Sequence, residues 1–213
     1  MIDGDHVLDV GCNLGYFVAH VHQKHPGKKI TGVDYFQANI DAARILFPDE
    51  SLSFAVKSVY ELDLEPASID CVTFQATIEH LEKAAQAIKQ INSVIKPGGS
   101  LIVTTDNPYS SNLFLSFLRC ELANILRRRR GLKSYLGPTI FNPDVEYARH
   151  VYCWTPSTLL TLLMINGFEY EAHSYVSDSS SLLERMFVRV FPFFSGIQVL
   201  KVRKIAEAPE KYV

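Results

Sequence analysis

The chain has 213 residues, of which 47% are hydrophobic and 21% are charged, so it is long enough for one sizeable core and too short for two. Its formal net charge of −2 argues against a general nucleic-acid binder, and no apolar run approaches the roughly 20 residues that a membrane-spanning helix needs. The four cysteines are scattered without a C-x-x-C pair, which indicates neither a zinc site nor a disulfide framework. We therefore expect a single cytoplasmic domain over residues 1–213.

Strand and helix patterns alternate through the first half of the chain. Apolar runs predict strands over residues 6–10, 28–34, 52–57, 68–74 and 100–105. Helical periodicity between them predicts helices over residues 16–24, 37–47 and 81–95, and the last of these is expected to end in a turn at "KPGG". Alternation of this kind predicts a parallel sheet with helices on both faces.

The second half departs from this rhythm. Residues 107–153 are rich in Asn, Pro, Arg and aromatic residues and carry their own apolar segment, so they are expected to form an insertion. Regular order resumes with a helix that is capped by Thr155 and closed at Gly167. Strands are then expected over residues 168–176 and 197–204. The connection between them is too short and irregular for a crossover helix, which favours an antiparallel final hairpin.

The first turn, "LDVGCNLGYF" at residues 8–17, follows a strand and opens a helix, where a doubly wound sheet binds its cofactor. A P-loop does not fit, because Tyr16 stands where its second glycine should be and no lysine follows. A dinucleotide fingerprint would run through Gly11, Asn13 and Tyr16, so it lacks two of its three glycines. Asp9 decides between the cofactors, because a fixed carboxylate disfavours a phosphate and stabilises a cation. S-adenosylmethionine carries an ammonium and a sulfonium and has no phosphate.

The acidic residues and glycines around this turn are consistent with one S-adenosylmethionine site. Asp9 is expected to face the ammonium group, and the bare backbone at Gly11 and Gly15 lets the methionine portion approach. Asp34, at the end of the second strand, is expected to accept hydrogen bonds from the ribose hydroxyls. Asn13 suits the turn because asparagine adopts left-handed backbone conformations more readily than other non-glycine residues.

Several stretches of the chain carry a family resemblance when they are taken in order. They are "VLDVGCNLGYF", "GVD" at 32–34, "SIDCVTF" at 68–74, "IEHLE" at 78–82, "VIKPGGSLIVTT" at 94–105 and the later "HVYCWTPSTLLTLLMINGF". Together they resemble the class I S-adenosylmethionine-dependent methyltransferases, in their small-molecule branch. The resemblance implies an α/β, Rossmann-like, doubly wound sheet of seven strands with an antiparallel last strand, and an enzyme that uses S-adenosylmethionine as its cofactor.

The resemblance also extends the expected cofactor site. It assigns adenine to the end of the third strand, where Ser58 and Val59 stand in place of a frequent aspartate, and Tyr35 is expected to lie against the adenine ring. Cys12, a small filler of the turn, and Gln75, at the end of the fourth strand, complete the set. Relatives carry helices before their first strand, whereas only five residues precede it here, so either the start of the chain is missing or the site is more open.

The candidate catalytic residues are Glu79, His80 and His150. The first two follow the fourth strand on the side where the transferable methyl is expected, and either histidine is a candidate general base for a hydroxyl acceptor. Oxygen is therefore the favoured acceptor atom. Some metal-dependent relatives place magnesium on E-x-x-E-H with a later histidine, but Ala76 replaces the first carboxylate, so no metal is assigned. The alternatives are metal-assisted 2′-O- or catechol-type O-methylation and a non-catalytic S-adenosylmethionine-binding module.

The insertion is expected to determine which acceptor binds. An apolar face over residues 113–126 is followed by four arginines at 127–130, which predicts a lid helix packed on the domain. Alternatively, the apolar face of residues 113–133 contacts a lipid-linked acceptor or a membrane surface while the arginines meet phosphates. The acceptor is thus expected to be a small or lipid-linked molecule, and the sequence predicts no oligomeric state.

Overall fold

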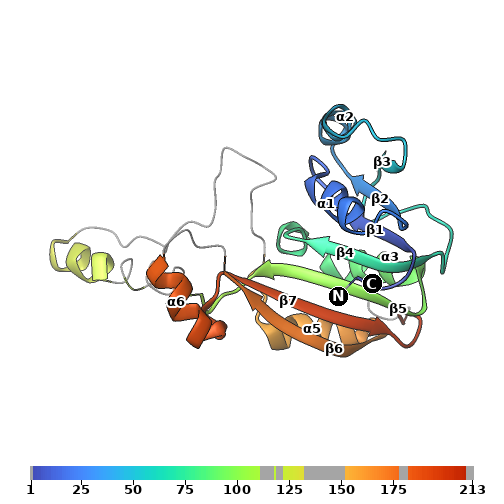
Figure 1. Ribbon diagram of the computed structural model, residues 1–213. Coiled ribbons are helices and arrows are strands. Elements are labelled where there is room, and N and C mark those ends of the chain that lie inside the picture. The colour runs from blue at the N-terminus through green and yellow to red at the C-terminus, as the bar shows by residue number, and fades with distance from the viewer. Residues whose placement is uncertain (1, 111–117, 119–121, 132–151, 178–181, 210–213) are drawn as a thin grey trace.

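A computed structural model describes residues 2–110, 118, 122–131, 152–177 and 182–209 of the chain. Its strands are β1 (His6–Val10), β2 (Lys29–Asp34), β3 (Leu52–Val56), β4 (Ile69–Gln75), β5 (Ile95–Asp106), β6 (Phe168–Val176) and β7 (Ile197–Lys204). They form one seven-stranded sheet in the order β3-β2-β1-β4-β5-β7-β6 (Figure 1). β7 runs antiparallel to both β5 and β6, and the other neighbours are parallel. The predicted Rossmann-like sheet with an antiparallel last strand is confirmed.

Helices cover both faces of this sheet. They are α1 (Tyr16–Lys24), α2 (Gln37–Leu46), α3 (Ala84–Val94), α5 (Pro156–Ile165) and α6 (Leu182–Val190), with short 3-10 helices η1 (Ile78–His80) and η3 (Pro192–Phe194). Ile88 of α3 and Leu159 of α5 belong to one buried cluster, whereas Val18 of α1 and Ile40 of α2 belong to another. The pleat sends successive strand residues to opposite faces, so Val7 joins the second cluster and Leu8 the first.

Two predicted boundaries differ from those in the structure: the start of α3, which follows β4, and the start of β5. α3 begins at Ala84 and not at residue 81, because residues 78–80 form η1 and Leu81 is extended. β5 begins at Ile95, so "KPGG" lies inside the strand and does not form a separate turn. The pairing with β4 is irregular near this point, and Gly98 accommodates the irregularity with a left-handed backbone (φ +76°).

The connection between the last two strands contains a helix that the sequence did not predict. α6 occupies Leu182–Val190, and β6 and β7 still pair as antiparallel neighbours, as expected. The predicted cap of α5 is confirmed, since the backbone N–H of Thr158 donates to Thr155 Oγ1 over 3.1 Å. None of the helices in the described parts of the chain is long and apolar enough to span a membrane.

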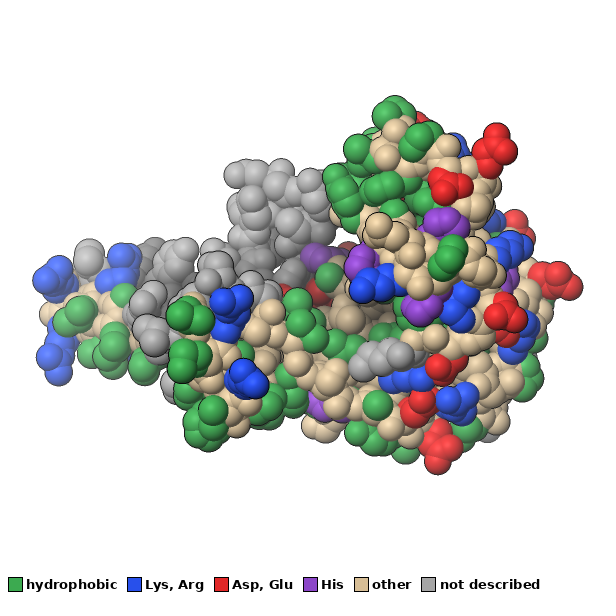
Figure 2. Space-filling model, viewed as in Figure 1, with side chains coloured by type: hydrophobic (Ala, Val, Ile, Leu, Met, Phe, Trp, Pro, Cys, Tyr) green, Lys and Arg blue, Asp and Glu red, His purple; other side chains and the backbone are tan. Residues whose placement is uncertain are grey.

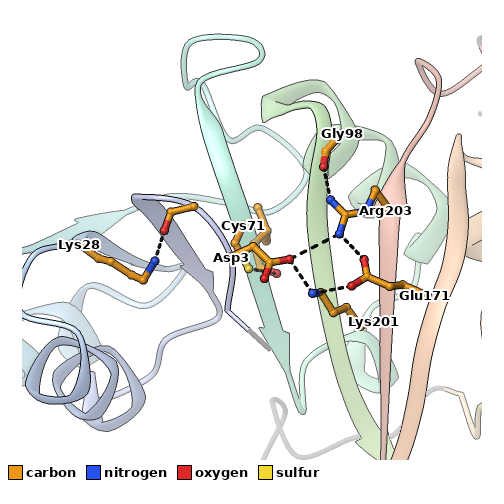
Figure 3. Close-up of polar contacts among 9 residues, drawn as sticks. Asp3, Lys28, Cys71, Gly98, Glu171, Lys201 and Arg203 are labelled. Atoms are coloured by element: carbon orange, nitrogen blue, oxygen red, sulfur yellow. Dashed lines mark hydrogen bonds and ion pairs between the residues drawn. The ribbon is translucent and has the colours of Figure 1, made fainter.

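An ion network ties the start of the chain to the antiparallel edge of the sheet (Figure 3). Lys201 is only 6% exposed, and its Nζ lies 2.6 Å from Asp3 Oδ2 and 2.7 Å from Glu171 Oε1. Arg203 Nη2 lies 2.7 Å from Glu171 Oε2. The hydrogen bond from Lys201 lowers the pKa of both carboxyl groups. Although burial opposes the lysine charge, its bonds to Asp3 and Glu171 raise the pKa of Lys201.

Removing the lysine is expected to destabilise the fold in a pH-dependent way. Lys201→Met should lower the free energy of unfolding at pH 7 by about 2 kcal/mol, below the range for a fully buried pair because Asp3 and Glu171 keep contact with solvent. The two carboxyl groups have lowered pKa values, so their contribution is present above pH ~4.5 and is lost as the pH falls through those values. Urea unfolding should therefore show the difference shrinking towards pH 3. Lys57→Met, at a surface pair, is the control, and an equal effect of both variants would contradict the prediction.

Candidate functional site

The turn between β1 and α1 is shaped by three residues in left-handed conformations. Gly11, Asn13 and Gly15 have φ angles of 76°, 49° and 78°, which confirms the backbone expected for Asn13. A Cβ atom on Gly11 would lie 2.4 Å from Thr77 Oγ1, and one on Gly15 would lie 2.7 Å from the ring of Phe54. Neither position can carry a side chain, because the neighbouring Thr77 and Phe54 fill the space and the backbone is left-handed, so both glycines are required by the shape of the turn.

Asp34 joins this turn to the end of β2. Its Oδ2 accepts the backbone N–H of Asn13 over 2.9 Å, and its Oδ1 accepts the N–H of Phe36 over 2.9 Å and Nδ2 of Asn39 over 3.1 Å. A carboxylate offers roughly four acceptor positions, so about one remains for a ligand hydroxyl. The side chain is 8% exposed. Asp34 therefore holds the turn in place and keeps limited capacity for a further donor.

Asp9 is a buried carboxyl group one residue before the carboxyl end of β1. Thr73 Oγ1 donates to its Oδ1 over 2.6 Å. Burial raises the pKa of Asp9 to about 7, the nearby Asp34 charge adds to the rise, and hydrogen bonds from Thr73 and Gln75 oppose it. Such a group is close to neutral when it has no cation beside it and is stabilised as a carboxylate when one binds.

The raised pKa of Asp9 predicts a pH dependence of cofactor binding. Only the ionised carboxyl stabilises a cation, so the dissociation constant for S-adenosylmethionine should be about eightfold higher at pH 6 than at pH 7.5. Because the folded-state pKa lies above the usual 3.8, the free protein loses stability as the pH rises from about 4 to 7. Asp9→Asn should therefore remove the pH dependence, weaken binding and raise the melting temperature at pH 7.5. Calorimetric titration and thermal melts measure both effects, and a wild-type affinity that is equal at the two pH values would contradict the role of Asp9.

The other expected cofactor residues lie around the same turn with different degrees of access. Tyr35 is exposed beside the end of β2. Ser58 Oγ accepts the N–H of Tyr60 over 3.2 Å, so it shapes its own turn, and Val59 packs against a core cluster. Cys12 is buried beside Gly32, and burial raises the pKa of its thiol. The Cys12 side chain is thus a core residue, as expected of a turn filler, and is not reactive.

Glu79 is the most unusual group at the carboxyl end of β4. It is 2% exposed, and its Oε2 has no hydrogen-bond partner among the residues that the structure describes. Burial raises the pKa of Glu79, and the nearby Asp106 adds to the rise, while His80 and the Thr105 side chain oppose it. A buried carboxyl oxygen without a partner costs about 1–3 kcal/mol. His80 follows it in η1 and is half-buried.

Figure 2 shows a hollow between the α1–α2 part of the molecule and the β5–β7 part, with histidine and acidic side chains at its base.

Sequence reasoning missed a group of buried polar atoms next to this end of β5. Gln198 is fully buried in β7 opposite Thr105, and its Nε2 donates to the carbonyl oxygens of Asp106 and Trp154. Within the described parts of the chain, its Oε1 has no hydrogen-bond partner, and neither has Nε1 of Trp154 or Nε2 of His173. One signal was available: a glutamine inside the otherwise apolar start of "IQVLKVRK" is out of place in a covered strand.

The remaining expected residues fall partly or wholly outside the described parts of the chain. His150 lies outside them, as do residues 113–117, 119–121 and 132–133 and much of the 107–153 insertion. Residues 122–129 are helical, as expected, but Leu122, Ile125 and Leu126 are exposed. The expectation that this apolar face packs on the domain as a lid is therefore wrong for these three side chains, because the helix projects away from the sheet (Figure 1).

A magnesium site of the E-x-x-E-H kind is not assembled by the residues that can be described. Ala76 occupies the position of the first carboxylate and has a left-handed backbone (φ 43°). Within residues 2–110, 118, 122–131, 152–177 and 182–209, no three His, Cys, Asp or Glu side chains come together as a metal site would require. These side chains do not fit the metal that some relatives hold.

Comparison with known proteins gives consistent matches. A family model described as a methyltransferase domain matches residues 8–103. The ubiquinone biosynthesis O-methyltransferase of Coxiella burnetii is 32% identical over 176 residues, covering 79% of this chain and 69% of that protein. The ubiquinone/menaquinone biosynthesis C-methyltransferase UbiE of Desulfotalea psychrophila is 23% identical over 113 residues, and the chain spans only 46% of its length. The structure of an S-adenosylmethionine-dependent methyltransferase from Mesorhizobium loti has a TM-score of 0.64 at 16% identity, covering 95% of this chain and 92% of that one, which is a likeness of fold.

Proposed function

The chain belongs to the class I S-adenosylmethionine-dependent methyltransferases, and from this membership we propose that it methylates an oxygen atom of a small or lipid-linked acceptor. The observation that carries the proposal is the buried carboxyl oxygen of Glu79 beside the carboxyl end of β4, for which the described residues provide no hydrogen-bond partner. A group kept at such a cost suits a proton transfer that an oxygen acceptor requires. A hydroxyl acceptor must lose its O–H proton during the transfer, and the Coxiella burnetii relative is named as an O-methyltransferase.

The cofactor side of the proposal rests on the first turn and the ends of β1 and β2. Asp9 stabilises the ammonium group, the backbone at Gly11 and Gly15 lies along the methionine portion, and Asp34 accepts from the ribose. Asn13 shapes the turn between them. S-adenosylmethionine supplies the methyl group on a sulfonium that is already primed to leave.

The adenine end of the cofactor is assigned to residues that border the same turn. Tyr35 is exposed and can lie against the adenine ring. Ser58 and Val59 belong to one turn, which is assigned to the edge of the adenine. Gln75 bonds to the Asp9 carboxyl and so keeps that group oriented. Cys12 contributes only its backbone, because its side chain belongs to the core.

Residues on the acceptor side of the site remove one proton from the acceptor hydroxyl. As the acceptor oxygen forms its bond to the methyl carbon, the carbon–sulfur bond breaks and the O–H proton passes to a base. Glu79 and His80 are the proposed bases, and His150 is the third candidate. Raised by burial, the pKa of Glu79 makes its carboxylate a stronger base than an exposed one. Gln198 and Trp154 offer unpartnered polar atoms that can hold the acceptor in line with the methyl group.

Two observations support a lipid-linked acceptor. The relatives at 32% and 23% identity are named for ubiquinone and menaquinone biosynthesis. In addition, the described part of residues 113–133 exposes apolar side chains beside arginines, which is suitable for contact with a lipid-linked acceptor or a membrane surface.

An acceptor screen tests the proposed function. The protein is incubated with S-adenosylmethionine labelled in its methyl group and with phenols, catechols, quinols, sugars and lipid-linked intermediates. We expect label on an oxygen of a phenolic or quinol acceptor. Label that appears only on nitrogen or carbon, or no transfer to any class, would contradict the proposal.

Chelation separates the proposal from metal-assisted O-methylation. Because Ala76 replaces a carboxylate ligand, turnover on the acceptor found by the screen should stay within about twofold after treatment with EDTA. Loss of activity with EDTA and its return with Mg²⁺ would favour the metal-assisted alternative.

A further inference from the structure

α6 presents an apolar surface that nothing in the described structure covers. Leu182, Met186 and Val190 follow one another at four-residue spacing and so lie along one side of the helix, and they are exposed by 63%, 60% and 69%. Phe187 and Phe191 lie beside them and are also exposed. Val188, by contrast, is buried. The helix therefore rests on the domain along a narrow edge and turns most of its apolar side chains outward.

The helix at residues 122–129 repeats this arrangement. Leu122, Ile125 and Leu126 are exposed, whereas Asn124 is buried. Figure 1 places this helix and α6 at the same end of the molecule, beyond the carboxyl end of β5. Both helices present apolar side chains next to arginines in the view of Figure 2. We call their exposed apolar and arginine side chains together the basic apolar surface.

The charged side chains that the structure describes on this surface carry one sign, although α6 also contains Glu184, whose side chain lies outside the described residues. The charged side chains described on the two helices are all arginines: Arg127, Arg128, Arg129, Arg130, Arg185 and Arg189, and all are exposed. Arg185 and Arg189 are one turn apart and flank the apolar side of α6. Long basic side chains at the border of an apolar stripe are typical of helices that lie in a membrane interface, where the stem is buried and the charged end reaches the phosphates.

An aromatic row leads from this surface to the candidate acceptor site. The rings of Phe187 and Phe194 are 5.6 Å apart, and so are those of Phe194 and Phe193. Phe193 contacts Tyr175 at 5.9 Å. Tyr175 lies opposite the buried Gln198 in the pairing of β6 with β7. An acceptor with an apolar tail could therefore keep its tail at the surface while its head lies near Gln198.

We propose that the basic apolar surface docks the protein on an anionic lipid bilayer, with α6 as its main contact. The inference rests on the proposed function, because it identifies the membrane as the source of a lipid-linked acceptor. It goes beyond residues 113–133, since α6 lies in a different part of the chain and carries the exposed Phe187 beside its apolar stripe. A second protein copy would bring the same arginines together and repel itself, so the charge favours lipid phosphates over self-association.

Vesicle flotation tests the proposal with the full chain. The wild type should float with phosphatidylcholine vesicles that contain phosphatidylglycerol and much less with phosphatidylcholine alone. Met186→Glu/Val190→Glu should reduce binding by at least about tenfold, and Arg185→Gln/Arg189→Gln should remove most of the preference for phosphatidylglycerol. Raising the salt from about 0.1 M to 1 M should have the same effect as the arginine variant, because it shortens the Debye length from ~10 Å to ~3 Å.

Matched controls keep the result interpretable. Ile45→Glu changes an apolar side chain that is 79% exposed on α2 and should leave vesicle binding unchanged. Every variant is checked by thermal melting and by its affinity for S-adenosylmethionine, which should equal the wild-type values. Wild type that does not float with anionic vesicles, or an equal loss for Ile45→Glu, would overturn the proposal. So would a dimer that Met186→Glu/Val190→Glu dissociates, because the surface would then join two copies. Failure of methyl transfer with intact vesicle binding would count against the proposed function alone.

Discussion

Replacing Glu79 with glutamine is expected to remove most of the turnover and to make the free protein more stable. The carboxyl group is buried and its Oε2 has no partner in the part of the chain that the structure describes, so glutamine relieves the cost of an uncompensated charge. The pKa of Glu79 is raised in the folded state, so its unfavourable contribution grows as the pH rises above about 4.5. The stabilisation by glutamine should therefore be larger at pH 8 than at pH 5, reaching about 1 kcal/mol or more.

The catalytic part of this prediction is measured on the acceptor that the screen identifies. Loss of a positioned base costs typically about 10²–10⁴-fold in rate, and Glu79→Gln should fall in that range while it binds S-adenosylmethionine like the wild type. Glu82→Gln, an exposed position nearby, is the matched control and should change neither rate nor stability. If Glu79→Gln melted at a lower temperature and kept its turnover within twofold, Glu79 would be a structural residue.

Replacing Asp34 with alanine should weaken cofactor binding strongly. Three donors lose their acceptor, namely the backbone N–H groups of Asn13 and Phe36 and the Asn39 side chain, and the ribose loses its partner. At about 1.5–3 kcal/mol for bonds to a charged group, the dissociation constant for S-adenosylmethionine should rise by roughly 10- to 150-fold. Calorimetric titration measures this value independently of any acceptor.

Two further variants separate the binding role of Asp34 from its structural role. Asp34→Asn keeps one carbonyl oxygen and should show an intermediate loss of affinity. Asp41→Ala removes an exposed carboxylate of α2 and should bind like the wild type. Unchanged affinity in Asp34→Ala, despite the loss of the three bonds, would refute contact with the ribose.

The strands and the order of the elements were predictable because each strand is a short apolar run between turn residues. The pleat and the burial on both faces force that pattern on β1, β2 and β4. The start of α3 was not predictable in the same way. Leu81 continues the helical spacing of α3, but the chain must first pass over the end of β4, where Ile78 and Glu79 are buried in η1. A tertiary requirement therefore overrides a local preference.

The candidate site likewise has a part that the sequence predicts and a part that depends on tertiary contacts. The residues of the first turn could be predicted because a left-handed backbone restricts the residue type, as at Gly11 and Asn13. The hydrogen bond from Thr73 to Asp9 depends on the pairing of β1 with β4, a contact between residues 64 positions apart. Gln198 meets Thr105 only because β7 enters the sheet antiparallel to β5. Contacts of this kind follow from the assembled sheet and not from spacing along the chain.

Calorimetric titration of the purified protein with S-adenosylmethionine, and separately with NAD, tests the assignment of the site most directly. We expect one S-adenosylmethionine to bind per chain. The affinity of the wild type should be lower at pH 6 than at pH 7.5, and Asp34→Ala should bind more weakly than the wild type. NAD should produce no binding heat, because its phosphates would face the Asp9 carboxyl group. Tight binding of NAD together with no response to S-adenosylmethionine would contradict the account.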